Sequence, residues 1–293
     1  EGNSSLIDSH AAVPFVTSID GTVARIYFSA RNSSNKSLIS FLDFDLNNHK
    51  VIRINDAPVL EPGLPGFFDE DGVMGCDSIR INNRTFIYYI GWNRATTVPF
   101  RNALGMAELC NEKAERVYNG PILDRNPHDP CFVASCCVIR HSEQFIMYYI
   151  SGLNWFMDQG KWNHRYHLKI ATSPDGFTWT PTGKTAIDFR YPNEYAISVP
   201  RVHYINGKFR MWYSYRGGPE SEFYRIGYAE SSDGFNWERK DEQFSFSGDT
   251  GDWEKDMHCY PFIFYHEHQY YMLYNGNGYG QSGFGLAVLT SPL

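Results

Sequence analysis

The chain has 293 residues and a mass of 33.7 kDa, which is enough for one large all-β domain or for two smaller domains. Its formal net charge of −7 argues against nucleic acid or an anionic membrane surface as the main partner. It contains no apolar run of about 18 residues, so no membrane span is predicted.

Aromatic residues make up 16% of the chain; they favour β-strands and also stack on the faces of sugar rings. The six cysteines have neither the spacing of a zinc site nor that of a small disulfide framework. We expect reduced, structural thiols, which favours a cytoplasmic location. The stretch 1–10 has no signal-peptide pattern, and a secreted or periplasmic location would require that such a peptide has been removed.

Five β-hairpins are predicted in chain order, each from two strand-forming runs around a turn. Their ranges are 11–31, 74–92, 132–152, 191–216 and 260–277. In the fourth hairpin, Asn206-Gly207 supplies the positive φ angles that a tight turn requires. Further strands follow the hairpins, at 37–54, 102–107, 167–173, 225–232 and 284–290.

Two of these later strands run into a Ser-x-Asp-Gly-x-x-Trp motif, at 173–179 and 231–237. A catalytic role for Asp175 and Asp233 is one interpretation of the motif. The other is a turn in which Asp caps its own backbone, Gly takes positive φ and Trp packs behind the sheet. We interpret both motifs as turns.

Five units of roughly 50 to 60 residues, each a four-stranded antiparallel meander, predict an all-β fold, a five-bladed β-propeller. The whole chain, 1–293, is expected to form this single domain. We expect Ser4 to His10 to complete the last blade.

The first strand of each blade in such a fold lies against the central axis, and the second runs back beside it. Residues before the first strand and after the second therefore meet on one face, around an axial funnel where ligands bind by default. The residues before the first strands include Asp8, Glu70, Asp71, Asp129, Glu194 and Asp256. Those after the second strands include Arg31, Trp92, Asn93, Arg94, Asn154, Trp155, Arg216, Asn275 and Asn277. Carboxylates, guanidinium groups, amides and indoles around one funnel predict a carbohydrate site, although the carboxylates could also be ordinary turn caps.

The repeated hairpins, the two turn motifs and the stretch 274–287 (YNGNGYGQSGFGLA) resemble the superfamily of five-bladed propellers that contains arabinanases, levansucrases and invertases. Within it, the chain is similar to family 43-like and mannoside-phosphorylase-like proteins, which are often encoded with bacterial polysaccharide genes. The resemblance implies acid/base cleavage or transfer at a glycosidic bond, with no cofactor.

In this interpretation Glu194 is the general acid, and Asp77 or Asp8 is the base or nucleophile. Asp77 and Arg201 occupy matching positions in two axial strands, so a buried structural ion pair is the alternative for both. The chain departs from the family where family 43 enzymes carry Asp before the proline of the first axial strand. Here the equivalent residues are Val13, Gly75, Ser135, Val199 and Tyr260.

Histidines offer a further possibility. His10 and His258 precede or begin axial strands of neighbouring blades, and with Asp8 and Asp256 they could form a metal site or a proton relay. No metal-binding spacing supports a metal, so none is predicted. His164 and His167 follow the third hairpin near Trp155, where contact with a substrate is plausible.

Three functions stay open. The first is a glycosidase or glycan transferase acting on an oligosaccharide, a polysaccharide or a sugar precursor. The second is a non-catalytic glycan-binding propeller, favoured by the missing Asp-Pro pair. The third is an enzyme for an activated or anionic sugar, in which arginines read a phosphate or carboxylate: Arg31, Arg94, Arg201 and Arg216.

Overall fold

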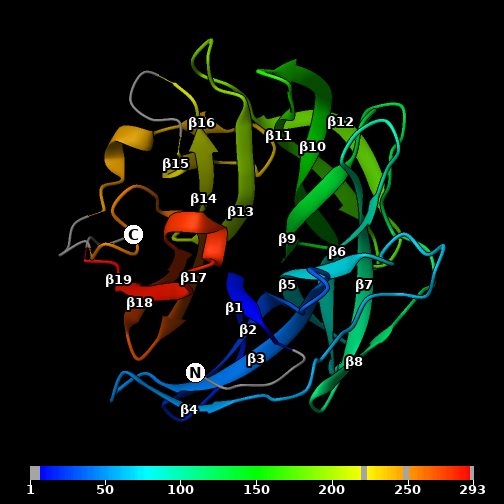
Figure 1. The fold of residues 1–293 in the computed structure, drawn as a ribbon. Helices are drawn as coiled ribbons and strands as arrows, with labels where there is room; N and C mark the ends of the chain where they lie inside the picture. The colour runs from blue at the N-terminus through cyan, green and yellow to red at the C-terminus, as the bar shows by residue number, and fades with distance from the viewer. Residues whose placement is uncertain (1–6, 219–222, 247–250, 291–293) are drawn as a thin grey trace.

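The computed structural model describes residues 7–218, 223–246 and 251–290 and shows an all-β molecule (Figure 1). Its strands are β1 (Ser9–Asp20), β2 (Val23–Arg31), β3 (Ser37–Asp45), β4 (Lys50–Ile54), β5 (Gly72–Ile81), β6 (Arg84–Arg94), β7 (Phe100–Cys110), β8 (Lys113–Arg116), β9 (Val133–His141), β10 (Gln144–Asp158), β11 (Lys161–Ser173), β12 (Thr180–Ile187), β13 (Ala196–Ile205), β14 (Lys208–Arg216), β15 (Arg225–Ser231), β16 (Glu238–Arg239), β17 (Cys259–His266), β18 (Gln269–Asn275) and β19 (Phe284–Val288). Two short 3₁₀ helices are η1 (Asp241–Gln243) and η2 (Asn277–Gly280). No helix in the described ranges is long and apolar enough to span a membrane.

Antiparallel pairing in chain order divides the described strands into five consecutive groups, which we call groups one to five. They are β1–β4, β5–β8, β9–β12, β13–β16 and β17–β19. Single parallel pairs, Ser37 with Gly72 and Tyr166 with Ala196, connect group one to two and group three to four.

Group five has three strands in the described part of the chain, where four were expected. The segment expected to supply the fourth, Ser4 to His10, begins outside the described residues. Its later part belongs to group one, because Ser9 pairs with Arg31 and the amide of Asp8 donates to the carbonyl of Arg31 at 2.8 Å.

The first strands of the groups lie around a common centre, which Figure 1 shows with β1, β5, β9, β13 and β17 innermost. Each first strand contacts the first strands of the groups before and after it, and β1 also contacts β17. The ring of groups is therefore closed, and residues from both ends of the chain meet at the centre.

The turn motifs connect neighbouring groups. Asp175 Oδ1 accepts hydrogen bonds of 2.8 Å from the amides of Phe177 and Thr178, so it caps the turn. The carbonyl of Gly176 accepts a hydrogen bond from the Tyr88 hydroxyl in group two at 2.8 Å. The second motif repeats this contact, between Gly234 in group four and Tyr148 in group three. The prediction that both motifs are structural turns is confirmed.

The core consists largely of aromatic and branched side chains between adjacent groups, with Tyr88, Tyr148 and Trp212 among the fully buried rings. All six cysteines are free, as expected, and four of them are buried. Burial raises the pKa of the Cys137 thiol to about 12, so this thiol is an unreactive part of the packing.

Candidate functional site

A pocket of about 130 Å³ opens at the centre of the ring, at the end where the first strands begin. We call it the axial pocket. Its lining residues come from all five groups: Val13, Met74, Ile90, Phe100, Asn102, Phe132, Ala134, Ser135, Ile150, His164, Tyr166, Ser198, Val199, Tyr224 and Tyr260. The funnel expected on this face is therefore present, and four of the five positions aligned with the family's Asp-Pro aspartate line it.

Three of these aligned residues have an unusual backbone. Val13, Val199 and Tyr260, each directly before a proline, have φ angles of 50°, 46° and 58°. Positive φ is strained for a β-branched residue, and such strain persists only where the surroundings enforce it. Here the amide of Val13 donates to Asn275 Oδ1 at 2.8 Å, and that of Tyr260 donates to Ser214 Oγ at 2.7 Å. In both cases a side chain on the second strand of one group holds the positive-φ residue in the first strand of the following group.

Tyrosines form one wall of the axial pocket. The hydroxyls of Tyr166 and Tyr224 are hydrogen-bonded to each other, and the rings of Tyr224 and Tyr260 lie 5.7 Å apart between centroids. Burial raises the pKa of Tyr166 and raises that of Tyr224 well above its usual value. Both hydroxyls therefore stay protonated, and because one of them donates to the other, the pair has one hydroxyl proton left to donate to a ligand.

The opposite wall is also aromatic. The ring of His164 lies 4.7 Å from Trp155 and 5.6 Å from Phe132, and it stacks on Tyr166 at 5.1 Å. Burial, and after it the positive charge of Arg216, lower the pKa of His164 to about 4. His164 is therefore neutral at pH 7, and the expected proximity of His164 and Trp155 to a binding site is supported by this geometry.

Among the described residues, no carboxylate lines the axial pocket. Glu194, the expected general acid, is fully buried, and its two carboxylate oxygens accept hydrogen bonds from Arg239 at 2.8 and 3.0 Å. The amide of Arg190 donates to the same carboxylate at 2.6 Å. Glu194 thus holds the loop before β13 against β16, and its carboxylate is occupied by these donors.

The same arrangement recurs in other groups. Asp69 accepts from the Tyr89 hydroxyl at 3.2 Å and from Arg116 at 2.8 Å. Asp129 accepts from the Tyr149 hydroxyl at 2.8 Å and lies 3.5 Å from Lys169 Nζ. Both carboxylates are fully buried. The carboxylates before the first strands are thus internal anchors between a loop and the strands of its own group.

In groups two and five the residue predicted from the sequence is not the anchor itself but lies one or two positions after it. In group two the anchor is Asp69, whereas Glu70 accepts from the amide of Gly66 at 2.7 Å. In group five Glu254 is buried, 3.3 Å from His258 Nε2, whereas Asp256 is exposed and bonds Asn277. The anchor lies seven positions before Cys76, Cys136 and Pro261 in groups two, three and five, but six positions before Pro200 in group four. Aligning the other groups on the spacing of group four therefore misses it.

Asp77 and Arg201 form a buried ion pair at the other end of the axis, with Arg201 Nη1 2.6 Å from Asp77 Oδ1. Asp77 Oδ2 also accepts from the amide of Val138 at 2.9 Å, and the Arg201 guanidinium lies 3.9 Å from the centroid of the Phe262 ring. The pair therefore joins the first strands of groups two to five. The alternative that these two residues pair structurally is confirmed.

The remaining predicted residues lie apart from the axial pocket. In group one, Asp8 is exposed, His10 bonds Ser9, and Arg31 donates to Asn35 Oδ1 at 2.7 Å. Burial and then Arg31 lower the pKa of His10. In group two, Arg94 is exposed and the Trp92 indole donates to Ser37 Oγ at 2.6 Å, across the boundary with group one.

Two further predicted residues belong to group five. Asn275 is fully buried; it accepts from Val13 and donates to the carbonyls of Ala11 and Gly283 at 2.8 and 2.7 Å. His258 is paired with Glu254 and stacks on Phe246 at 4.3 Å. In the described ranges no group of three His, Cys, Asp or Glu side chains could hold a metal ion.

A hollow of about 530 Å³ lies between groups four and five. Its lining residues include Arg190, Tyr191, Tyr215, Arg225 and His258. Arg190 pairs with Glu242 at 3.1 Å, whereas Arg225 donates through Nη2 to the carbonyl of Gly217 at 3.1 Å. Sequence reasoning did not include Arg225, because it begins β15 and no counterpart in other groups marks it.

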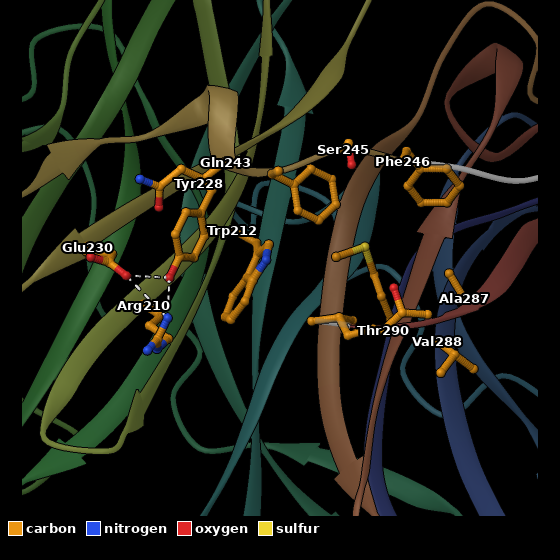
Figure 2. Close-up of a pocket in the computed structure, with 13 residues that line it drawn as sticks. Arg210, Trp212, Tyr228, Glu230, Gln243, Ser245, Phe246, Ala287, Val288 and Thr290 are labelled. Carbon is orange, nitrogen blue, oxygen red and sulfur yellow. Dashed lines mark hydrogen bonds and ion pairs between the residues drawn. The ribbon is translucent and has the colours of Figure 1, made fainter. Parts of the chain in front are cut away.

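Another hollow, of about 280 Å³, lies between the outer parts of the same two groups (Figure 2). On one side Arg210, Tyr228 and Glu230 bond one another, with distances from 2.7 to 3.2 Å. On the other side Figure 2 shows Phe246, Ala287 and Val288. Because its polar wall is internally paired, this hollow is a less apt site for a polar ligand than the axial pocket.

Comparison with known proteins places this geometry in a family. No protein-family model matches the chain. It is 37% identical over 287 residues to Uncharacterized protein Rv1502 of Mycobacterium tuberculosis (strain ATCC 25618 / H37Rv), with 97% of this chain and 93% of that protein covered. The chain belongs to the Rv1502 family. Because the match spans nearly both chains, members of the Rv1502 family share the full set of groups described above.

Solved structures share the fold of this Rv1502 family member. A structure of BT0996 in an RGII complex has a TM-score of 0.77 at 16% identity, covering 99% of this protein and 90% of BT0996. A structure from the GH130 family of mannoside phosphorylases, reported to contain hydrolases of β-1,2-mannosidic linkages in Candida mannan, has a TM-score of 0.68 at 15% identity, covering 97% and 85%. A thermostable family-43 glycoside hydrolase has a TM-score of 0.67 at 14% identity, covering 97% and 91%.

These identities are low, so the likeness is one of fold. At that level the expected resemblance to the five-bladed superfamily is confirmed, since its family 43-like and mannoside-phosphorylase branches both match. The glycoside hydrolase-like fold of the chain is thereby established, and its chemistry depends on the residues of its own pocket.

Proposed function

We propose that this chain is a five-bladed β-propeller that binds a carbohydrate in the axial pocket and does not cleave it. The observation that carries the proposal is a pocket wall of aromatic rings and hydroxyl groups, without a carboxylate among the described residues that line it. The half-buried rings of Phe100 and Tyr260 offer faces for a sugar ring, and tyrosine and serine hydroxyls offer partners for its hydroxyls.

Five groups of antiparallel strands around one centre, with group one in contact with group five, support the proposed blade number. Fold neighbours that act on carbohydrates support the ligand class. The pocket volume of about 130 Å³ limits the buried part of the ligand to about one sugar ring.

Hydrolysis by the usual mechanism requires two carboxyl groups roughly 5 to 10 Å apart on either side of the scissile bond. The three expected catalytic carboxylates do not meet this requirement together. Glu194 is bonded to Arg239, Asp77 to Arg201 at the other end of the axis, and Asp8 is exposed on group one. Binding without cleavage is consistent with this separation.

Glycosidic bond cleavage or transfer is the second candidate, and the glycoside hydrolases among the fold neighbours favour it. It would require carboxylates on the rim, such as Asp8 and Asp256, to reach a long ligand that extends from the pocket. Both residues are exposed on this face.

The test is a screen of neutral and acidic oligosaccharides by isothermal titration calorimetry, with product analysis by chromatography. We expect binding without turnover. Tyr260→Ala should weaken binding about tenfold, since it removes a half-buried ring from the pocket wall. Tyr265→Ala is the matched control, because Tyr265 is 52% exposed and lies at the other end of β17.

The variants Asp77→Asn and Glu194→Gln distinguish carbohydrate binding alone from cleavage or transfer of a glycosidic bond. If the protein only binds, folded samples of both variants keep the wild-type affinity. Turnover that either substitution abolishes would contradict the binding proposal and restore that carboxylate as a catalytic group.

A further inference from the structure

Arg216, the last residue of β14, lies directly behind the tyrosine wall of the axial pocket. Its guanidinium carbon is 4.8 Å from the ring centroid of Tyr195, 4.9 Å from that of Tyr224 and 5.9 Å from that of Tyr279. Its Nη1 donates a 2.8 Å hydrogen bond to the Tyr279 hydroxyl. The cation is thus surrounded by aromatic faces at the edge of the pocket.

Arg216 forms no ion pair with a carboxylate in the described ranges, and its Nε is buried without a hydrogen-bond partner there. A buried charge normally has a counter-charge, because desolvation is costly. Burial alone would lower the pKa of Arg216, but the surrounding tyrosines hold it above its ordinary value, so the guanidinium stays charged.

The charge of Arg216 acts on the titratable groups of the pocket. It lowers the pKa of His164 and opposes the rise that burial causes in the pKa of Tyr166, Tyr224 and Tyr260. Within the described part of the chain, no carboxylate is among the leading influences on these four groups. The pocket therefore has a positive local field within a chain whose net charge is −7.

A second cation, Arg225, lies outside the axial pocket and lines the neighbouring hollow. Arg225 is paired with Tyr215 at the start of β15, next to Arg216. It lacks a carboxylate partner in the ranges that the structure describes, and its Nε and Nη1 are buried without partners there. By contrast, Arg190, Arg201 and Arg239 each pair with a carboxylate.

We propose that the axial pocket selects a sugar that carries an oxyanion group, a carboxylate or a phosphate, and that Arg216 supplies the charge that selects it. The inference rests on the proposed function and adds the substrate class to it. The bonded Tyr166–Tyr224 hydroxyl pair has one proton left, which it donates to the oxyanion, and Arg216 behind the pair stabilises the charge.

The test compares methyl glucuronoside, glucose 1-phosphate, methyl glucoside and inorganic phosphate by calorimetry at two salt concentrations. We expect at least one anionic sugar to bind about tenfold or more tightly than the neutral sugar, as a charge-assisted hydrogen bond implies. This preference should shrink at high salt. Comparing the affinities for methyl glucuronoside and glucose 1-phosphate identifies which oxyanion the pocket prefers. The affinity for inorganic phosphate shows whether the sugar ring is needed for binding.

Arg216→Gln should abolish the preference for the anionic sugar, and Arg216→Lys should retain part of it. Arg190→Gln is the matched control, because Arg190 lines the neighbouring hollow but pairs with Glu242. Equal binding of anionic and neutral sugars by the wild type would overturn the inference and leave the proposed function standing; this comparison needs no variant to fold. Binding of no sugar at all would overturn the proposed function. A preference that survives Arg216→Gln would overturn the assignment of Arg216.

Discussion

The role of a buried or half-buried residue in this molecule depends on the partner that its side chain contacts. Arg201 is buried on β13, and Arg216 is half-buried at the end of β14, both in group four. Arg201 is neutralised by Asp77, whereas Arg216 has tyrosines around it. The first is therefore part of the framework, and the second is the residue that we assign to ligand selection.

The Asp77–Arg201 pair predicts a large effect on stability. Asp77→Ala leaves the Arg201 guanidinium buried without its counter-ion, which should lower the free energy of unfolding by about 3–5 kcal/mol. The double variant Asp77→Ala with Arg201→Met should recover part of this loss, because it removes both charges. Urea unfolding followed by tryptophan fluorescence measures both.

Asp158→Ala is the control for this pair, since Asp158 is exposed at the end of β10 and should change stability by no more than about 0.5 kcal/mol. A single Asp77→Ala variant as stable as this control would contradict the structural role of the pair.

Groups two, three and four each carry an anchor between the loop that precedes the first strand and the strands behind it. In group two Asp69 bonds Tyr89 and Arg116, and in group three Asp129 bonds Tyr149 and pairs with Lys169. The repetition indicates that these buried carboxylates maintain the shape of the funnel. Their equivalent places in the sequence are thus explained by the repeated architecture.

Glu194→Gln tests the anchor of group four. It removes the ion pair with Arg239 but keeps an acceptor, and we expect a loss of about 1–3 kcal/mol, the value of a hydrogen bond to a charged group. Faster amide hydrogen exchange should be confined to residues 190–195 and β16. Glu242→Gln, at an exposed carboxylate that also binds an arginine, should have little effect. Exchange that rises equally in all groups would show that the anchor is not local.

The whole molecule depends on contact between its two ends. The side chain of Asn275, in group five, uses both its oxygen and its amide nitrogen, and two of its bonds reach Ala11 and Val13 in group one. Since these residues are 264 and 262 positions away in the chain, the bonds close the ring.

Asn275→Ala should therefore destabilise the ring more than Ser214→Ala, its counterpart in group four. It leaves one amide and two carbonyls without partners, whereas Ser214→Ala leaves only the amide of Tyr260. Each orphaned group costs about 1–3 kcal/mol. Thermal unfolding and limited proteolysis at the 1–20 segment compare the two variants. Equal melting temperatures would contradict a special role for this seam.

The hairpins, the turn motifs and many of the residues that face the axis could be predicted from the order of amino acids alone. Asn206-Gly207 has φ angles of 52° and 76°, and the residues before Pro14, Pro200 and Pro261 line the pocket. Turn chemistry and strand periodicity act between near neighbours in the chain, and the repeats showed which positions are equivalent.

Which polar residues remain free to meet a ligand depends instead on contacts between distant parts of the chain. Glu194 and Arg239 are 45 positions apart, and Asp77 and Arg201 are 124 apart. A carboxylate is available to a substrate only if no buried cation already occupies it, and that is set by distances across the folded ring. The same reason left Tyr166, Tyr224 and Tyr260 unrecognised as a wall, because they come from three different groups of strands.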